Sequence, residues 1–282
     1  METLLQKKPV EQLTFADDGM FQAVLRDPQI CAELVELLLG IKVKRVEYPE
    51  LEKVIEPFYT TKGVRLDVYL KDEDKVIDVE LQSYEQDALG KRTRYYQSML
   101  DMDALMKGED YENLKESYVL FICKYDPFKD KNGKPFGLPR YTFRNFCEEN
   151  NLVNLDDKSL KMFYNATAYE DEKDERIKAL LRFVQTDEPE KDDFSNRLAA
   201  LVAKLKKNEI FKQEYSRMNL HDRDKIKEGM KLGAQQKAIE NAKTMLADNL
   251  SPEKISQYSG LSLEQVRELA EQLAAQPAPA QG

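Results

Sequence analysis

Two short segments of alternating polarity, separated by a charged run, constrain the fold most strongly. Residues 64–70 read VRLDVYL and residues 76–82 read VIDVELQ, so that apolar and polar side chains alternate along each segment. Alternation with a period of two predicts a half-buried β-strand. The run KDEDK between the segments is a polar turn, and the three pieces together predict a β-hairpin.

The hairpin would bring two acidic side chains together. A turn centred on residues 73 and 74 places Asp67 directly opposite Glu80, with Cβ atoms roughly 4.5–5.5 Å apart. The alternation also puts Asp78, Glu80 and Gln82 on one face of the second strand. Because like charges directly opposed are destabilising, we expect a cation between them. Mg²⁺ suits this role, since it takes one or two carboxylates and keeps positions for water and phosphate oxygens.

The alternative is an ordinary amphipathic hairpin with a solvated polar face, which is the commonest meaning of such alternation. For Asp78 we expect solvent exposure rather than a second metal ion, because another buried charge would need a partner of its own.

The order of the other elements predicts a mixed α/β or α+β core. Asp27 and Pro28 fit the N-cap and first position of a helix that ends at Gly40. A short extended segment is expected at 54–59, and a helix at 87–107. The continuous apolar run YVLFIC at 118–123 is typical of a strand covered on both faces.

The second half of the chain predicts a helical appendage. From about residue 171 the sequence is helical and strongly charged, and it ends in two short helices separated by Gly260. Ser262 and Gln265 form a capping box at the start of the last helix. We therefore expect a domain at 10–170, a helical module at 171–274 and a disordered tail at 275–282.

Composition excludes several kinds of chemistry. His221 is the only histidine, the three cysteines show no CxxC spacing, and no phosphate-binding loop motif is present. With 43 basic and 52 acidic residues the net charge is −9, so the chain is not a polycationic DNA clamp. Of the common catalytic chemistries, the composition therefore leaves the one that uses Asp and Glu carboxylates. No apolar leader opens the chain and no apolar stretch is long enough to span a bilayer, so we expect a cytoplasmic protein without a membrane partner.

The ordered set KGVRLD, VIDVELQ and, one helix later, RTRYY resembles the recombination-promoting nucleases of the PD-(D/E)XK superfamily, also described as nuclease-family transposases. The resemblance extends from about Phe15 to the C-terminal pair of helices. It implies a restriction-endonuclease-like fold, with a mixed central sheet flanked by helices. It also implies Mg²⁺-dependent cleavage of DNA phosphodiester bonds, linked to recombination or mobile elements.

The resemblance assigns roles to individual residues. Asp67 takes the first acidic position, Glu80 the second, and Gln82 the position of the lysine in the superfamily's name. Asp67, Glu80 and the backbone carbonyl of Leu81 would then hold Mg²⁺, with Mn²⁺ as a substitute, while Gln82 positions the attacking water. Glutamine lacks the positive charge of lysine and only orients and weakly polarises water, but it is typical of this group.

The helix after the hairpin supplies candidate DNA contacts. Arg92, Tyr95 and Tyr96 would approach the phosphate backbone, because a guanidinium fork matches phosphate geometry. The alternative is that Tyr95 and Met99 belong to the core and that Arg92 pairs with a carboxylate of the site.

Two alternatives stay open for the C-terminal module and for function. The last two helices could read DNA, but LEQVRELAEQL is rich in glutamate, so we favour packing or self-association into a homo-oligomer. For the whole chain, the alternative to an endonuclease is a catalytically inactive regulatory protein that keeps the nuclease fold and binds DNA or protein.

Overall fold

The computed structural model of the chain describes residues 8–43, 50–55, 64–248 and 250–274. It contains two compact units, one formed by Lys8–Tyr215 and one that begins at Ser216. The helices between residues 171 and 206, which the sequence assigned to the C-terminal module, pack within the first unit. The expected tail at 275–282 and part of the extended segment at 54–59 lie outside the described residues.

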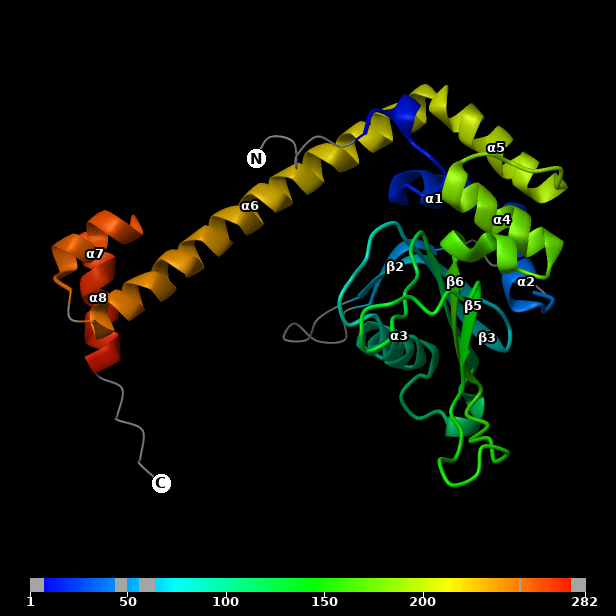
Figure 1. The fold of residues 1–282 in the computed structure, drawn as a ribbon, viewed down its shortest axis with the longest axis horizontal. Coiled ribbons are helices and arrows are strands. Elements are labelled where there is room, and N and C mark those ends of the chain that lie inside the picture. The colour runs from blue at the N-terminus through cyan, green and yellow to red at the C-terminus, as the bar shows by residue number, and fades with distance from the viewer. Residues whose placement is uncertain (1–7, 44–49, 56–63, 249, 275–282) are drawn as a thin grey trace. The chain divides into compact units, whose positions relative to one another are not determined.

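A six-stranded mixed sheet forms the centre of the first unit (Figure 1). Its spatial order is β1-β2-β3-β4-β6-β5, in which β3, β4 and β6 run parallel and the other neighbours run antiparallel. This confirms the predicted mixed sheet. The strands are β1 (Glu50–Ile55), β2 (Val64–Lys71), β3 (Lys75–Gln82), β4 (Glu116–Cys123), β5 (Arg140–Phe143) and β6 (Ser159–Asn165).

Helices cover both faces of the sheet, and each face has its own apolar cluster. One cluster joins the sheet to α1 (Asp18–Leu25), α2 (Pro28–Leu39), α4 (Glu175–Thr186) and α5 (Asp193–Lys206). The other joins it to α3 (Leu89–Ala104) (Figure 1). The parallel strand β4 at the sheet centre needs cover on both sides, because its apolar side chains are buried on both faces. Short 3₁₀ turns lie at Val10–Gln12, Tyr111–Asn113 and Ala166–Asp171.

The predicted start of α2 is confirmed in detail. The carboxylate of Asp27 accepts hydrogen bonds from the backbone N–H groups of Gln29 and Ile30, at 2.9 and 3.2 Å, and Pro28 occupies the first helical position. Gly40 ends the helix in the left-handed conformation, at φ 66°.

Asp27→Ala is expected to lower the free energy of unfolding by about 1 kcal/mol, because two N–H groups at the helix start lose their acceptor. Urea unfolding measures this change, with Asp27→Asn as the control that keeps an acceptor and loses less. Equal losses in the two variants would show that charge, and not capping, sets the effect.

The predicted hairpin is also confirmed. Strands β2 and β3 are antiparallel, with Val68 opposite Val79 and Leu70 opposite Ile77, and Asp72 N–H closes the turn onto the carbonyl of Lys75. The two residue numbers in each pair sum to 147, as expected for a turn centred on residues 73 and 74.

One feature of β2 differs from the prediction. We expected Val64, Leu66, Val68 and Leu70 on one face, but Leu66 packs in the α3 cluster and Val68 packs in the opposite cluster. The alternation therefore breaks at Asp67, whereas the residues after it keep the predicted register with β3.

The structure divides the two residues of α3 that were considered together as core residues in the alternative to DNA contacts. Of these, Met99 is buried, whereas Tyr95 is exposed. The buried residues of the helix are Leu89, Thr93, Tyr96, Gln97, Met99 and Leu100.

The second unit is helical. It contains most of α6 (Glu209–Ala247), followed by α7 (Pro252–Ser259) and α8 (Leu263–Ala274). A small core of Ala242, Ile255, Leu261 and Val266 joins the three helices. The predicted capping box is confirmed, because Ser262 N–H donates to Gln265 Oε1 and Gln265 N–H donates to Ser262 Oγ, at 2.9 and 3.2 Å.

Candidate active site

The acid pair is joined through the backbone where β2 and β3 leave their regular register. Asp67 N–H donates to Glu80 Oε1 at 2.9 Å, and Leu81 N–H donates to Asp67 Oδ2 at 3.2 Å. Each carboxylate thus accepts from the backbone of the opposite strand. Glu80 is 1% exposed and Asp67 is half-buried. The two groups predicted to meet do face one site.

Arg92 of α3 is the cation that the structure places beside this pair. Its Nη2 lies 3.0 Å from Glu80 Oε2, its Nη1 donates to Gln82 Oε1 at 3.2 Å, and its Nη1 also donates to Gln86 Oε1. The hydroxyl of Tyr96 accepts from Nε at 2.9 Å and from Nη2 at 2.7 Å. One guanidinium therefore contacts both β3 side chains of the predicted site.

Gln82 is held at both ends of its amide. The side chain is 5% exposed, and it donates from Nε2 to the carbonyl of Leu81 at 3.2 Å while Oε1 accepts from Arg92. The carbonyl of Leu81 is the one that the family resemblance implies as a metal ligand. In this structure Gln82 therefore fixes that carbonyl.

The expectation that Asp78 faces solvent was wrong. Asp78 is fully buried, and neither of its carboxylate oxygens accepts a hydrogen bond within the described part of the chain. It lies opposite Tyr69 on the face of β3 that α3 covers. The polar face of this strand is an interior face, so the solvated hairpin is also excluded.

Burial and mutual repulsion shift the acids of β3 toward the neutral form. Burial, followed by the charge of Asp67, raises the pKa of Glu80 to about 8. Burial, followed by the charges of Glu80 and Asp67, raises the pKa of Asp78 well above its ordinary value. A cation bound beside these acids would lower their pKa values again, because it stabilises the ionised form.

The acid pair opens into a cleft of about 690 Å³. The cleft lies at the carboxyl end of the parallel strand β3, which is where open α/β sheets bind ligands. The side chains around it come from the ends of β2 and β3, the loop that follows, and α3. They include Asp67, Glu80, Gln82, Tyr84, Lys91, Arg92, Tyr95 and Tyr96.

The donors fit a hard divalent cation. Carboxylate and carbonyl oxygens are the ligands that Mg²⁺ prefers, and Asp67, Glu80 and the Leu81 carbonyl supply them at one place. Among the described residues, no three acidic, histidine or cysteine side chains are arranged as a complete metal site. An ion here would accordingly take two side chains, one carbonyl and several waters, as Mg²⁺ commonly does.

Tyr95 and Tyr96, which the sequence analysis proposed together as DNA contacts, differ in exposure and in their contacts. Tyr96 is 7% exposed and anchors Arg92, while Tyr95 is 37% exposed at the cleft. The sequence did not single out Asp18 or Gln86, both of which line the cleft. Asp18 comes from α1, far away in sequence, so no local pattern could have identified it.

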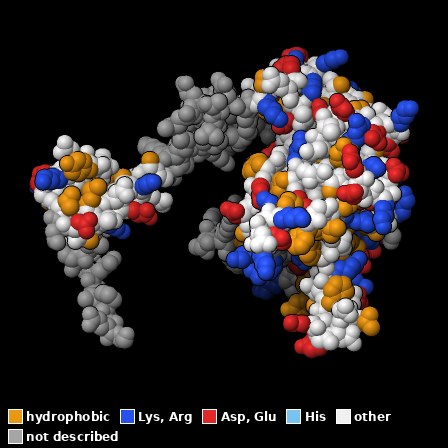
Figure 2. All heavy atoms as spheres, viewed as in Figure 1, with side chains coloured by type: hydrophobic (Ala, Val, Ile, Leu, Met, Phe, Trp, Pro, Cys, Tyr) orange, Lys and Arg blue, Asp and Glu red, His pale blue; other side chains and the backbone are white. Residues whose placement is uncertain are grey.

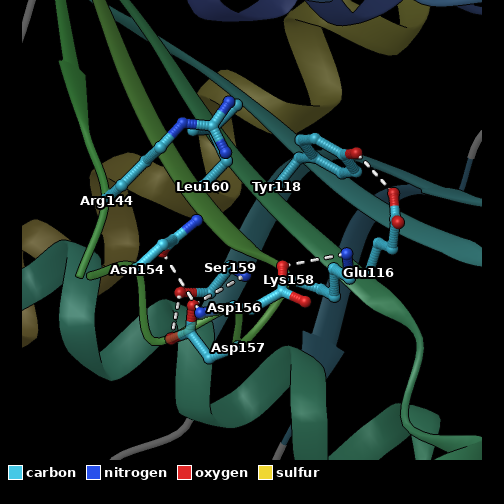
Figure 3. Close-up of a pocket in the computed structure, with 9 residues that line it drawn as sticks. All are labelled: Glu116, Tyr118, Arg144, Asn154, Asp156, Asp157, Lys158, Ser159 and Leu160. Carbon is cyan, nitrogen blue, oxygen red and sulfur yellow. Dashed lines mark hydrogen bonds and ion pairs between the residues drawn. The ribbon is translucent and has the colours of Figure 1, made fainter. Parts of the chain in front are cut away.

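A second, smaller hollow of about 170 Å³ lies at the opposite ends of the parallel strands, where β4 and β6 begin (Figure 3). Its acids already have partners. Asp156 pairs with Lys158 at 2.9 Å, and Asp157 accepts from Ser159 Oγ at 2.8 Å. It has no carboxylate as deeply buried as those beside the Asp67 cleft, so it is the weaker candidate.

The face of the first unit that Figure 2 shows is not uniformly basic. Figure 2 shows Lys and Arg side chains interspersed with Asp and Glu over the visible side of the first unit, in line with the net charge of −9. Among the helices that the structure describes, none combines the length and apolar character needed to cross a membrane.

A mixed six-stranded sheet flanked by helices, with an acid pair in a cleft at strand ends, defines a restriction-endonuclease-like fold. The family model described as PD-(D/E)XK nuclease family transposase matches residues 20–231, and the chain belongs to this family. The family suggests a nuclease linked to mobile elements, and nucleases of this superfamily generally use divalent metal ions. Searches among curated proteins and among solved structures found no match.

Proposed function

We propose that the protein is a Mg²⁺-dependent DNA endonuclease that hydrolyses phosphodiester bonds during recombination or transposition of mobile elements. The observation that carries this proposal is the pair of backbone hydrogen bonds that hold the Asp67 and Glu80 carboxylates across the β2–β3 hairpin, at an open cleft: Asp67 N–H donates to Glu80, and Leu81 N–H donates to Asp67. Membership of a nuclease family supports it.

The chain's own groups have distinct proposed roles. Asp67, Glu80 and the Leu81 carbonyl would hold the ion, and Gln82 would fix the Leu81 carbonyl and orient the attacking water. A bound divalent cation would acidify that water and stabilise the charge that develops on the phosphate. Arg92 and Tyr95, at the cleft, are the proposed contacts to the DNA backbone, while Tyr96 holds Arg92 in place.

Glu80→Gln is expected to weaken Mn²⁺ binding by about tenfold or more, because a neutral amide replaces a buried carboxylate ligand. Isothermal titration of the full chain measures this directly. Glu73→Gln is the matched control, because Glu73 lies exposed in the turn of the same hairpin. Equal Mn²⁺ affinity in wild type and Glu80→Gln would remove Glu80 from the proposed site.

The rival function is an inactive binding protein, and one observation favours it. Glu80, a proposed metal ligand, already pairs with Arg92. DNA binding that is equally tight with Mg²⁺ and with EDTA, without cleavage, would select the rival. Self-association through α7 and α8 stays a prediction, as does a cytoplasmic location.

A further inference from the structure

Arg92 contacts one of the two Glu80 oxygens that a bound cation could use. Glu80 Oε1 accepts from Asp67 N–H, and Glu80 Oε2 contacts Arg92 Nη2 at 3.0 Å. Both oxygens are therefore engaged. A divalent ion that binds Glu80 either shares Oε1 with the Asp67 N–H, or shares Oε2 with the guanidinium or displaces it. In each case the ion and the guanidinium repel each other across one carboxylate.

Arg92 is also placed to stay in the cleft after it leaves Glu80. The Tyr96 hydroxyl and Gln86 hold the guanidinium independently of Glu80. The Arg92 side chain is 27% exposed and lines the cleft, so its freed nitrogen would point toward a ligand there. The freed N–H of Nη2 can donate a charge-assisted hydrogen bond to one phosphate oxygen.

We propose that Arg92 is shared between Glu80 and the substrate phosphodiester: it pairs with Glu80 in the ion-free protein and transfers to a phosphate oxygen when the ion takes Glu80. This inference rests on the proposed nuclease function. It makes metal and DNA binding mutually reinforcing, because each ligand removes a competitor of the other. By linkage the enhancement is the same in both directions.

The test compares Arg92→Met and Arg92→Lys with the wild-type full chain. Arg94→Met is the matched control, since Arg94 is an exposed arginine on the same helix. Titration calorimetry measures Mn²⁺ affinity without DNA. Fluorescence anisotropy measures binding of a labelled DNA duplex, once with Ca²⁺ and once with EDTA.

The wild type is expected to bind DNA about fivefold or more tightly with Ca²⁺ than with EDTA, within the usual range of such coupling. In Arg92→Met, Mn²⁺ should bind the free protein more tightly, while the Ca²⁺ enhancement of DNA binding should fall toward one. Arg92→Lys keeps the charge without the fork, so it should retain weak Mn²⁺ binding and lose part of the enhancement. Arg94→Met should keep both wild-type values.

Weaker Mn²⁺ binding in Arg92→Met would overturn the proposal, because Arg92 would then only orient Glu80. An unchanged Ca²⁺ enhancement in Arg92→Met and Arg92→Lys would overturn it too. Failure of the nuclease function looks different: the wild type would itself bind no Mn²⁺. If Arg92→Met does not fold, Arg92→Lys decides, because intact Ca²⁺ enhancement in that variant contradicts a role for the fork.

Discussion

Asp67→Ala is expected to reduce Mg²⁺-dependent nicking of plasmid DNA by a factor of about 10² to 10³ or more, the scale set by loss of one preorganised electrostatic group in an active site. Asp67 is placed to contribute a metal ligand, and its carboxylate also accepts from the N–H of Leu81, the residue whose carbonyl is another proposed ligand. The substitution therefore damages two proposed ligands at once. Conversion of supercoiled to open-circular plasmid measures the loss.

Asp74→Asn is the control for this experiment. Asp74 lies exposed in the turn of the same hairpin, at the end remote from the cleft, and pairs with Lys75. It should retain wild-type nicking. Full activity in Asp67→Ala would remove the site assignment, and activity that survives EDTA in the wild type would point to a contaminating enzyme.

The ion-free protein is expected to lose stability as the pH rises from about 4.5 to about 8. The ordinary carboxyl pKa of Glu80 is 4.5 and its folded value is about 8, so the folded state holds a proton that the unfolded state releases. A pKa raised by folding contributes stability that is complete below the ordinary value and disappears as the pH passes the folded value. The raised pKa of Asp78 acts in the same direction. The expected loss is on the order of a few kcal/mol, since each unit of pKa shift is worth about 1.4 kcal/mol.

Urea unfolding with EDTA at pH 5 and pH 8 measures this dependence. Asp78→Asn should flatten it, because the variant removes one buried carboxyl with little change of shape, and saturating Mg²⁺ should restore stability at pH 8. Asp74→Asn should keep the wild-type slope. Equal slopes in wild type and Asp78→Asn would show that Asp78 does not contribute to the pH dependence.

The local features of the fold could be predicted from the sequence, because neighbouring residues determine them. The β2–β3 register from Val68 to Lys71 follows from the alternation and the length of the charged turn. Asp67 lies just beyond this regular pairing, and its N–H still reaches the Glu80 carboxylate. The capping at Asp27 and the capping box at Ser262 follow from short-range hydrogen bonds. These signals need no knowledge of how distant elements pack.

The errors concern contacts between distant elements. Asp78 was expected to face solvent because a lone strand with alternating polarity is usually half exposed, but α3 covers that face. The rotation of α3 that buries Tyr96 and exposes Tyr95 depends on the aromatic side chains it meets on β4, such as Phe121. No spacing within the helix encodes that choice.

The role of Arg92 could be predicted only in part from the sequence. The sequence left open whether Arg92 contacts phosphate or pairs with a carboxylate of the site, and the structure shows the second contact, with Glu80. Because the guanidinium lies in the cleft, the first contact remains available. The two alternatives become successive states of one side chain in the proposed mechanism.

The position of a bound ion tests the central claim most directly. Crystals of the full chain grown with Mn²⁺ should give an anomalous difference peak between the carboxylates of Asp67 and Glu80, beside the carbonyl of Leu81. Crystals of Asp67→Ala grown in the same way should lack it. A wild-type map without a peak at this position, at a Mn²⁺ concentration that supports nicking in solution, would contradict the account.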